Sequence, residues 1–483
     1  MATGKHRAPP KKKKRSPQAL LTVAAAALVL VALTVILPRL GQVAPAGPNE
    51  ALDRTVPLSE AGELPPLDSY DVELQLEGGA LSVSGTGAMP ALYRELSEEQ
   101  LASVETLELG RDLTSLDPDA FRGCTRLREL TLPDGLTAIG AGAFADCKLE
   151  TITIPASVTQ IAEGAFRGCT TLKEILVEAG NPSYVSVDGV LLSSDGRLLL
   201  CYPGSREARG YRVPEGVTRI ADYAFSGFLL TETLFLPASV TEIGPDALSR
   251  CYGLAAIKVN GDNPAFSAAD GVLYDRDKRV LLRYPSAKTS ARFSLPKSVE
   301  EIGPCAFCEN YELSEVTLPE RLTTIGRGAF SGCSFLKKIN FPQSVAEIGE
   351  EAFLSCSRLT EIRLPQSLTS LGARAFAYCY ELRELTLPGG VQLLGEEAFL
   401  RCDVLRTATL DEGVPAVGAG MFRQCGELEE VSLPQSVTAV GAEAFADCGA
   451  LRTLRYAGTQ EQWAAVSVDP TALPEGLAPS FGG

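Results

Sequence analysis

A unit of 23 residues recurs along this chain, and that repeat limits the possible fold more than any other feature of the sequence. The unit has the form L-x-x-L-x-L-P-x-S-V-T-x-I-G-x-x-A-F-x-x-C and is clearest in residues 359–379 and 428–448. One aromatic column marks twelve copies: Phe121, Phe144, Phe166, Phe225, Leu248, Phe307, Phe330, Phe353, Phe376, Phe399, Phe422 and Phe445. Repeats of this length bury their apolar faces against one another, so all 483 residues need not divide into globular domains. The repeat therefore predicts one elongated solenoid.

The hydrophobic period changes within each unit, and that change predicts the local structure. Leu385 and Leu387 alternate with polar residues as in a half-buried strand, which Pro388 ends because proline has no amide hydrogen for a ladder. Residues 391–394 indicate a second, shorter extended piece, and residues 396–402 about one turn of helix. The predicted fold is a solenoid of about twelve 23-residue repeats, with a curved parallel β-sheet and short helical or 3-10 turns on the convex side.

A cysteine column accompanies the aromatic column. Ten of the 13 cysteines stand three residues after it: Cys124, Cys147, Cys169, Cys251, Cys333, Cys356, Cys379, Cys402, Cys425 and Cys448. A disulfide framework is one interpretation for an exported chain. Thiols stacked at one repeat position are better explained as buried free fillers, since Phe228 and Asn310 take the two remaining places. Cys305 and Cys308 form a lone C-x-x-C outside that column, without a second pair or a histidine for zinc. Structural thiols are the favoured interpretation of this pair, and a redox role is the alternative.

Two inserts of 36 residues, at about 178–213 and 260–295, lengthen the repeat and match each other at a spacing of 82 residues. Both carry an Asn-Pro-x-aromatic motif, an Asp-Gly pair and a Tyr-Pro pair. Asp-Gly between alternating apolar residues is a hairpin signal. Each insert is therefore predicted to be a small β-hairpin that interrupts or decorates the solenoid.

The first 66 residues have a different character. Residues 19–37 are apolar except for two threonines, and a helix of that length spans roughly 28 Å, close to a bilayer core of about 30 Å. The basic cluster 11–15 precedes it and favours a cytoplasmic amino terminus. We predict a basic cytoplasmic tail (1–18), a transmembrane signal anchor (19–37) and a Pro-rich linker (38–66), which makes a single-pass membrane protein with an extracellular repeat domain. A cleaved signal peptide or a nuclear localisation patch are the alternatives.

Charge and histidine content exclude several functions. The first 40 residues hold eight of the 44 Lys and Arg and no acid, so the remainder has 36 bases against 60 acids, a net charge of −24. That charge disfavours nucleic-acid binding. The single histidine, His6, lies in the basic tail, so the repeats cannot form a catalytic triad, a Cys-His dyad or a His-ligated metal site. No cofactor is predicted.

The repeat resembles the BspA-like, or bacterial surface antigen, class of leucine-rich repeat. Segments outside it are similar too: 81–90 to the β-rich piece ahead of the family's first repeats, and 456–463 to the aromatic piece after its last. The expected organisation is therefore a β-rich amino-terminal cap (67–105), leucine-rich repeats (106–456) and a carboxyl-terminal cap and tail (457–483). The resemblance implies a curved solenoid on a bacterial surface, often adhesive toward host matrix or other cells, without catalytic residues.

A ligand face is predicted on the first strands, because side chains between the buried leucines point outward. The candidate residues are Glu129, Thr131, Glu174, Phe235, Glu315, Thr317, Glu361, Arg363, Glu384, Thr386 and Glu430. The sequence favours a non-enzymatic adhesion protein whose partner is a host matrix or other cell-surface protein. An envelope scaffold for the cell's own proteins is the alternative, and a glycoside hydrolase with paired carboxylates is a remote one. Solubility alone also accounts for Glu and Thr on an exposed strand face, so the hairpin inserts and loops compete as the ligand site.

Overall fold

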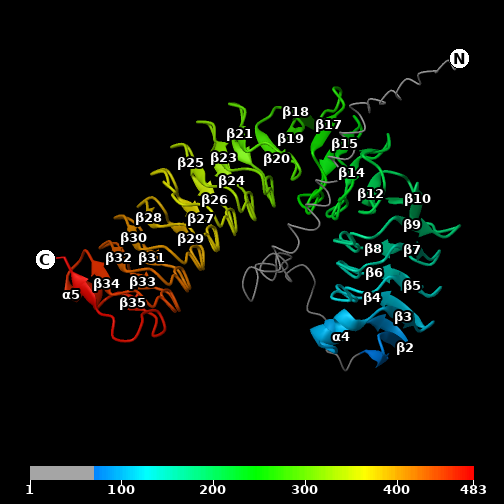
Figure 1. The fold of residues 1–483 in the computed structure, drawn as a ribbon, viewed down its shortest axis with the longest axis horizontal. Coiled ribbons are helices and arrows are strands. Elements are labelled where there is room, and N and C mark those ends of the chain that lie inside the picture. The colour runs from blue at the N-terminus through cyan, green and yellow to red at the C-terminus, as the bar shows by residue number, and fades with distance from the viewer. Residues whose placement is uncertain (1–69, 483) are drawn as a thin grey trace, which may run out of the picture. The chain divides into compact units, whose positions relative to one another are not determined.

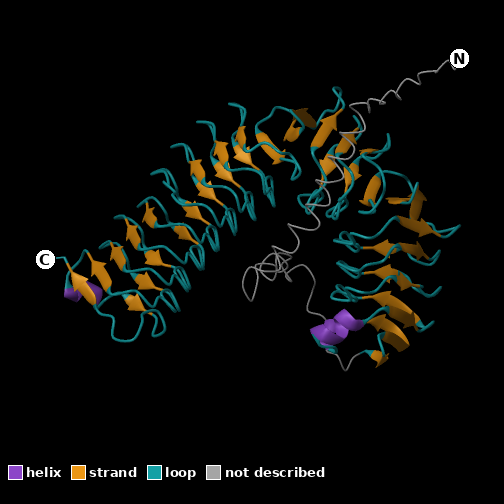
Figure 2. Cartoon of the chain, viewed as in Figure 1, coloured by secondary structure: helices purple, strands orange, loops and turns teal. Residues whose placement is uncertain are grey.

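The computed structural model describes residues 70–482, in which successive turns of the chain stack in sequence order (Figure 1). Most turns of the parallel β-solenoid contribute a first strand and a second strand, and loops form most of their remaining length (Figure 2). The first strands are β3 (Thr106–Leu109), β5 (Glu129–Leu130), β7 (Thr151–Ile154), β9 (Glu174–Val177), β13 (Gly210–Arg212), β15 (Thr233–Leu236), β17 (Ala256–Val259), β21 (Arg292–Ser294), β23 (Glu315–Thr317), β25 (Lys338–Asn340), β28 (Glu384–Leu387), β30 (Thr407–Leu410), β32 (Glu430–Leu433), β34 (Thr453–Tyr456) and β36 (Pro479–Phe481). The second strands are β4 (Leu113–Leu116), β6 (Ala138–Ile139), β8 (Gln160–Ile161), β14 (Arg219–Ile220), β16 (Glu242–Ile243), β22 (Glu301–Ile302), β24 (Thr324–Ile325), β26 (Glu347–Ile348), β27 (Ser370–Leu371), β29 (Leu393–Leu394), β31 (Ala416–Val417), β33 (Ala439–Val440) and β35 (Ser467–Val468).

The array has about 17 turns rather than the twelve that the aromatic column predicted. The five additional turns carry β2 (Ala80–Met89), β3, β13, β21 and β36. Two of them lie inside the inserts, where Tyr202 and Tyr284 take the place of the column phenylalanine. Tyr284 stacks on Phe307 with ring centroids 5.1 Å apart, which shows how a tyrosine continues the same core.

The predicted helical segment before each cysteine is wrong. Residues 396–402 form hydrogen-bonded turns, and Glu397 and Arg401 both adopt positive φ, 55° each. Left-handed residues interrupt a helix, because a right-handed helix needs negative φ throughout. The amide of Phe399 instead donates to the carbonyl of Met421 in the next turn, at 3.0 Å. These segments therefore bond to neighbouring turns as well as within themselves, where the Leu400 amide donates to the carbonyl of Glu397 at 3.0 Å.

Each insert contains an antiparallel hairpin and a third strand that rejoins the array. The strands are β10 (Tyr184–Val187), β11 (Val190–Ser193) and β12 (Leu198–Cys201) in one insert, and β18 (Phe266–Ala269), β19 (Val272–Asp275) and β20 (Val280–Arg283) in the other. Asp188 and Gly189 both have positive φ, as a type I′ turn requires. Asn263 anchors the second hairpin, because its side-chain amide donates to the carbonyls of Pro237 and Val240, both at 2.8 Å. β12 and β20 then pair in parallel with β14 and β22.

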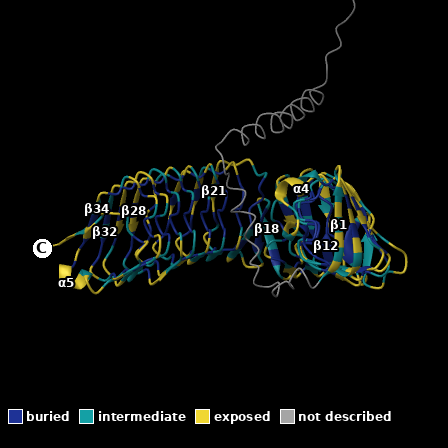
Figure 3. Cartoon of the chain, turned by 90° about the horizontal axis from the view of Figure 1, so that it is seen from below, coloured by how far each residue is buried: buried dark blue, intermediate teal, exposed yellow. Residues whose placement is uncertain are grey.

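The hairpins divide the buried core into three clusters. In β11, Leu191 packs with the preceding cluster, while Val190 and Leu192 pack with the following one. In β19, Leu273 packs with the preceding cluster and Tyr274 with the following one in the same way. Figure 3 shows buried residues along the inside of the stack and exposed residues at its outer surface. β11 and β19, the middle strands of the two inserts, are thus partitions, each with a core cluster on either side.

The ends of the repeat array differ from its interior. β1 (Asp71–Glu77) pairs with β2 in an antiparallel manner, and η3 (Leu92–Arg94) and α4 (Glu98–Ser103) follow. α4 begins with a capping box, in which Ser97 and Gln100 each accept a main-chain amide of the other. At the other end α5 (Gln460–Trp463) places Trp463 against Tyr456, with ring centroids 5.1 Å apart.

One interruption of the second-strand ladder has a clear cause. Thr369 and Gln392 donate their amides to the preceding turn at 2.9 Å, and Thr438 does so at 2.8 Å. Pro415 holds the same position in its own turn and has no amide hydrogen to donate. The ladder accordingly stops at β29 and starts again at β31.

The predicted tail, transmembrane anchor and linker (residues 1–66) lie outside the described residues. Among the helices of residues 70–482, none is long and apolar enough to cross a bilayer.

Candidate functional site

The first strands expose one set of side chains and bury the next, so the predicted ligand residues lie on a common kind of surface. In β28, Leu385 and Leu387 are buried while Glu384 and Thr386 are exposed. We call these outward side chains of successive first strands the first-strand face. The structure places Glu129, Thr131, Glu174, Glu315, Thr317, Glu361, Arg363, Glu384 and Thr386 there as exposed residues, and Phe235 and Glu430 as half-buried ones.

This face is not one continuous sheet. The first strands divide into groups of paired strands: β2-β3-β5, β7-β9, β13-β15-β17, β21-β23-β25 and β28-β30-β32-β34-β36. The two hairpins account for the breaks after β9 and β17. The break between β5 and β7 falls near the unit that is one residue shorter than the others. The break before β28 lies within a regular run of units, and no residue of that strand motif explains it.

Arginines on the same or a neighbouring strand neutralise several of the predicted acids. Three ion pairs lie on the face: Arg292 with Glu315 at 3.2 Å, Arg363 with Glu361 at 2.8 Å and Arg455 with Glu430 at 3.0 Å. Arg292 comes from an insert and was not among the predicted residues. Glu129, Glu174 and Glu384 form no ion pair within residues 70–482. Unpaired acids therefore remain on the face, but at separated places.

Phe235 carries a cation on each side. The guanidinium of Arg212 lies 4.7 Å from its ring centroid and the ammonium of Lys258 lies 5.2 Å from it. Such contacts stabilise by roughly 0.5–1 kcal/mol each at exposed sites. The ring is held in place rather than presented as a free apolar surface.

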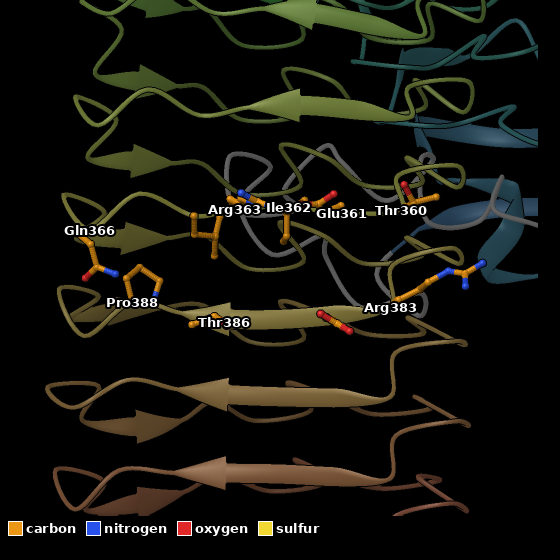
Figure 4. A pocket seen from close by; sticks show the side chains of 10 residues that line it. Thr360, Glu361, Ile362, Arg363, Gln366, Arg383, Thr386 and Pro388 are labelled. Atoms are coloured by element: carbon orange, nitrogen blue, oxygen red, sulfur yellow. Dashed lines mark hydrogen bonds and ion pairs between the residues drawn. The ribbon is translucent and has the colours of Figure 1, made fainter.

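An opening on the face lies between residues 360–366 and β28, and its volume is about 660 Å³. Volumes of roughly 300–1,000 Å³ are common for sites that hold small ligands. Figure 4 shows Ile362 directed toward β28, with Arg363 and Gln366 toward one end and Thr360 and Arg383 at the other. We call this opening the strand cleft. A smaller one of about 260 Å³ lies over the paired strands β23 and β25.

Sequence analysis missed an exposed apolar ridge next to the cysteine column. Leu229, Leu230, Tyr252, Tyr311 and Phe335 are each between 38 and 47 % exposed, and all follow that column by one or two residues. The guanidinium of Arg358 packs over the exposed Phe335 ring, 4.5 Å from its centroid. The signal was available, because the position directly after the buried column is exposed or half-buried in every unit.

The cysteine column forms a ladder of thiol hydrogen bonds. All thirteen cysteines are free. The Cys379 thiol donates to the carbonyl of Phe353 at 3.4 Å, and the Cys448 thiol donates to that of Phe422 at 3.0 Å. Burial raises the pKa of Cys333 to about 12, and that of the fully buried Cys147 well above its usual range. These thiols are packed and protonated at neutral pH.

Cys305 and Cys308 are chemically unlike the column. The Cys308 thiol is buried and donates to the carbonyl of Gly328 at 3.1 Å. A hydrogen bond with Cys308 lowers the pKa of the half-buried Cys305, whereas burial raises the pKa of Cys308 well above its usual range. Cys305 is therefore the more reactive thiol of this pair.

We expect native protein at pH 8 to take up one equivalent of iodoacetamide, at Cys305, and denatured protein to take up all 13 without reductant. The reason is that a thiolate, not a thiol, reacts, and burial keeps the column protonated. Mass spectrometry of labelled peptides measures the count, and Cys305→Ser serves as the control that abolishes native labelling. Fewer than 13 labels after denaturation would reveal disulfides and contradict the prediction.

Half-buried carboxylates outside the face link neighbouring turns. Glu163 accepts the amide hydrogen of Asp222 at 2.8 Å, and Asp222 accepts that of Asp246 at 3.0 Å. Burial raises the pKa of Asp222, whereas in Glu163 burial is outweighed by hydrogen bonds from Arg219 and the Asp222 amide, which lower the pKa. Across residues 70–482, no group of three or more His, Cys, Asp or Glu is placed to hold a metal ion.

Comparisons with known proteins agree with the repeat motif. The family model described as "BspA type Leucine rich repeat region" matches six times, over residues 99–185, 201–267, 286–405 and 355–464. No curated protein matches the chain.

Among solved structures, a leucine-rich repeat protein from Eubacterium ventriosum is 24% identical, with 86% of this chain and 97% of that one covered and a TM-score of 0.43. The pneumococcal vaccine antigen PcpA is 19% identical over 85% and 96% of the two chains, with a TM-score of 0.42. A leucine-rich cell surface protein from Faecalibacterium prausnitzii is 23% identical over 83% and 96%, with a TM-score of 0.39. The family matches span more than half of the residues, and the chain belongs to the BspA-type leucine-rich repeat family.

Proposed function

We propose that this protein is a membrane-anchored adhesin of the bacterial surface, which binds a host matrix or other cell-surface protein along its first-strand face. Repeat arrays of this kind commonly serve as scaffolds for protein–protein interaction, because stacked units present an extended surface. The observation that carries the proposal is the set of exposed side chains on successive first strands, which the core does not require. The strand cleft gives this surface a concave site.

The location rests on the sequence of the amino terminus. The apolar segment 19–37 has the length of a bilayer span, and the basic cluster 11–15 precedes it. The net charge of −24 in the remaining chain suits an exposed domain that stays away from anionic lipid. The PcpA antigen and the Faecalibacterium cell surface protein, which share the repeat architecture, support the outward placement.

A capture experiment tests the proposal. Residues 41–483 are immobilised and exposed to extracts of host matrix and mucus, and separately to envelope extract of the producing cells. Retention of a host protein supports adhesion. Retention of envelope proteins alone assigns the chain to the alternative function, a scaffold for the cell's own proteins. A hydrolase assay on the same material addresses the remaining alternative, which gains support if turnover survives purification and disappears on changing one Asp or Glu.

Reversal of two charges on the face should weaken capture. We expect Glu361→Lys together with Glu384→Lys to raise the dissociation constant of the captured protein about tenfold, because complementary charge guides association. Surface plasmon resonance at two salt concentrations measures the effect.

The matched control is Glu347→Lys together with Glu396→Lys, which alters the net charge equally on exposed positions of neighbouring segments away from the first strands. Equal weakening by both double variants would show that overall charge, not the first-strand face, governs binding.

A further inference from the structure

The two turns that border the strand cleft are hydrogen-bonded through their second strands but not through their first-strand segments. On the second-strand side, Ser370 and Leu371 pair with Leu393 and Leu394, and the Gly395 amide donates to the carbonyl of Leu371 at 2.8 Å. On the first-strand side, β28 is the edge of its five-stranded sheet. Residues 361–364 join the preceding strand only through the bridge between Lys338 and Glu361. The cleft therefore has a strand edge along each wall.

The main chain of β28 leaves definite groups facing the cleft. The carbonyl of Arg383 accepts the Arg406 amide and the carbonyl of Leu387 accepts the Asp411 amide, both at 2.9 Å. Main-chain groups of alternate residues point to opposite sides of a strand. Since the odd-numbered residues face β30, the amide hydrogens and carbonyls of Glu384 and Thr386 face the cleft.

The opposite wall offers the complementary set. Ile362 holds the same place in its unit as Leu385, whose main chain faces the following turn. The main-chain amide and carbonyl of Ile362 thus face β28 across the cleft, and no strand pairs there within residues 70–482. Unpaired strand edges bind other chains readily, because each free donor and acceptor gains a partner.

Apart from the charged Arg383 and Glu384, the side chains around the cleft provide an apolar floor and a neutralised rim. Ile362 and Leu364 are 7 and 9 % exposed and form an apolar floor. Glu361 and Arg363 neutralise each other at the rim through their 2.8 Å ion pair. A small ion cannot satisfy two strand edges at once, whereas an extended polypeptide carries donors and acceptors along both of its sides, at the spacing of a strand.

We propose that the strand cleft accepts an extended polypeptide segment of the partner, which enters as an additional strand between residues 361–364 and β28. The segment pairs with Glu384 and Thr386 on one edge and with Ile362 on the other. β28 has four residues, so a segment of about four residues fills the cleft at roughly 3.3 Å per residue. The inference rests on the proposed function, because it names how the first-strand face holds a protein partner.

The test uses the full chain and a fluorescein-labelled peptide that copies residues 406–411, the segment that contains β30 and carries no net charge. We expect saturable binding by fluorescence anisotropy, together with slower hydrogen exchange at the amides of Glu384 and Thr386. The control is the same peptide with N-methyl groups at the positions of Thr407 and Thr409. Methylation removes main-chain donors but keeps every side chain, and should weaken binding at least about tenfold.

A pair of protein variants separates main-chain pairing from side-chain contact. Thr386→Pro removes an amide that faces the cleft and not the ladder with β30, so the fold is retained while peptide binding falls about tenfold. Thr386→Ala keeps the amide and should bind as the wild type does. Thermal unfolding verifies that both variants are folded.

Three results overturn the inference: no binding at millimolar peptide, equal binding of the methylated peptide, or wild-type binding by Thr386→Pro. If the capture experiment retains a partner that Thr386→Pro also retains, strand insertion fails and the adhesin proposal stands. If capture fails while the peptide still binds in the cleft, the adhesin proposal fails instead.

Discussion

Phe353→Ala should lower the free energy of unfolding by about 3–5 kcal/mol, the usual cost of removing a buried aromatic ring. Phe353 is fully buried and lies between Phe330 and Phe376, with ring centroids at 5.0 and 4.9 Å and interplanar angles of 7 and 1°. Phe341 adds an edge contact at 5.6 Å. Truncation to alanine leaves a gap inside a continuous stack, which adjacent turns cannot close because their own ladders fix their spacing. Denaturant unfolding followed by circular dichroism measures the change.

Phe335→Ala is the matched control, since that ring is 43 % exposed. We expect it to change stability by less than about 1 kcal/mol. Equal losses for the two variants would mean that the aromatic column contributes no more than a surface ring, and the account of the core would be wrong.

Gly395→Ala should destabilise the protein by about 3 kcal/mol, at the upper end for a substitution that overfills a packed site. A Cβ at this position would lie 2.0 Å from the amide nitrogen of Ala373 and 2.4 Å from the carbonyl carbon of Gly372. Both are main-chain atoms, so the two turns would have to separate and stretch the hydrogen bond from Gly395 to Leu371. That bond belongs to the ladder that joins the turns behind the strand cleft.

Gly449→Ala provides the comparison, because an added Cβ there meets nothing within 4 Å. A change of no more than about 0.5 kcal/mol, of either sign, is expected for that variant. Thermal unfolding of the two single variants measures the contrast. Similar melting temperatures would indicate that adjacent turns have room for a methyl group and are not held in close main-chain contact.

The repeated unit contained enough information to predict the stacking, the strand alternation and the outward side chains. Leu385 and Leu387 are buried and Glu384 and Thr386 exposed, as a period of two requires. The two turns within the inserts were missed, because Tyr202 and Tyr284 replace the phenylalanine and no column cysteine follows at the usual distance. The helical turns were wrong because acidic and basic residues adopt the left-handed conformation that glycine holds in other units.

The strand cleft lay beyond prediction for a different reason. Leu359, Ile362 and Leu364 repeat the pattern of every neighbouring unit. That pattern specifies which side chains are buried, but it does not specify whether two adjacent strands approach closely enough to pair. Ion pairs across strands, such as Arg292 with Glu315, depend in the same way on which turns are neighbours. The 36-residue insert that contains Arg292 decides which turn lies next to Glu315.

The partitions at β11 and β19 have a mechanical consequence. Because Leu191 and Val190 pack into different clusters, loss of one cluster does not directly strip contacts from the next. Solenoids unfold by steps that spread between neighbouring units, and a weak boundary halts such spreading. If the proposed anchor and partner hold the two ends, tension between them should extend the chain in up to three separate force steps. In the proposed adhesin, these steps would lengthen the chain before the bound partner is released.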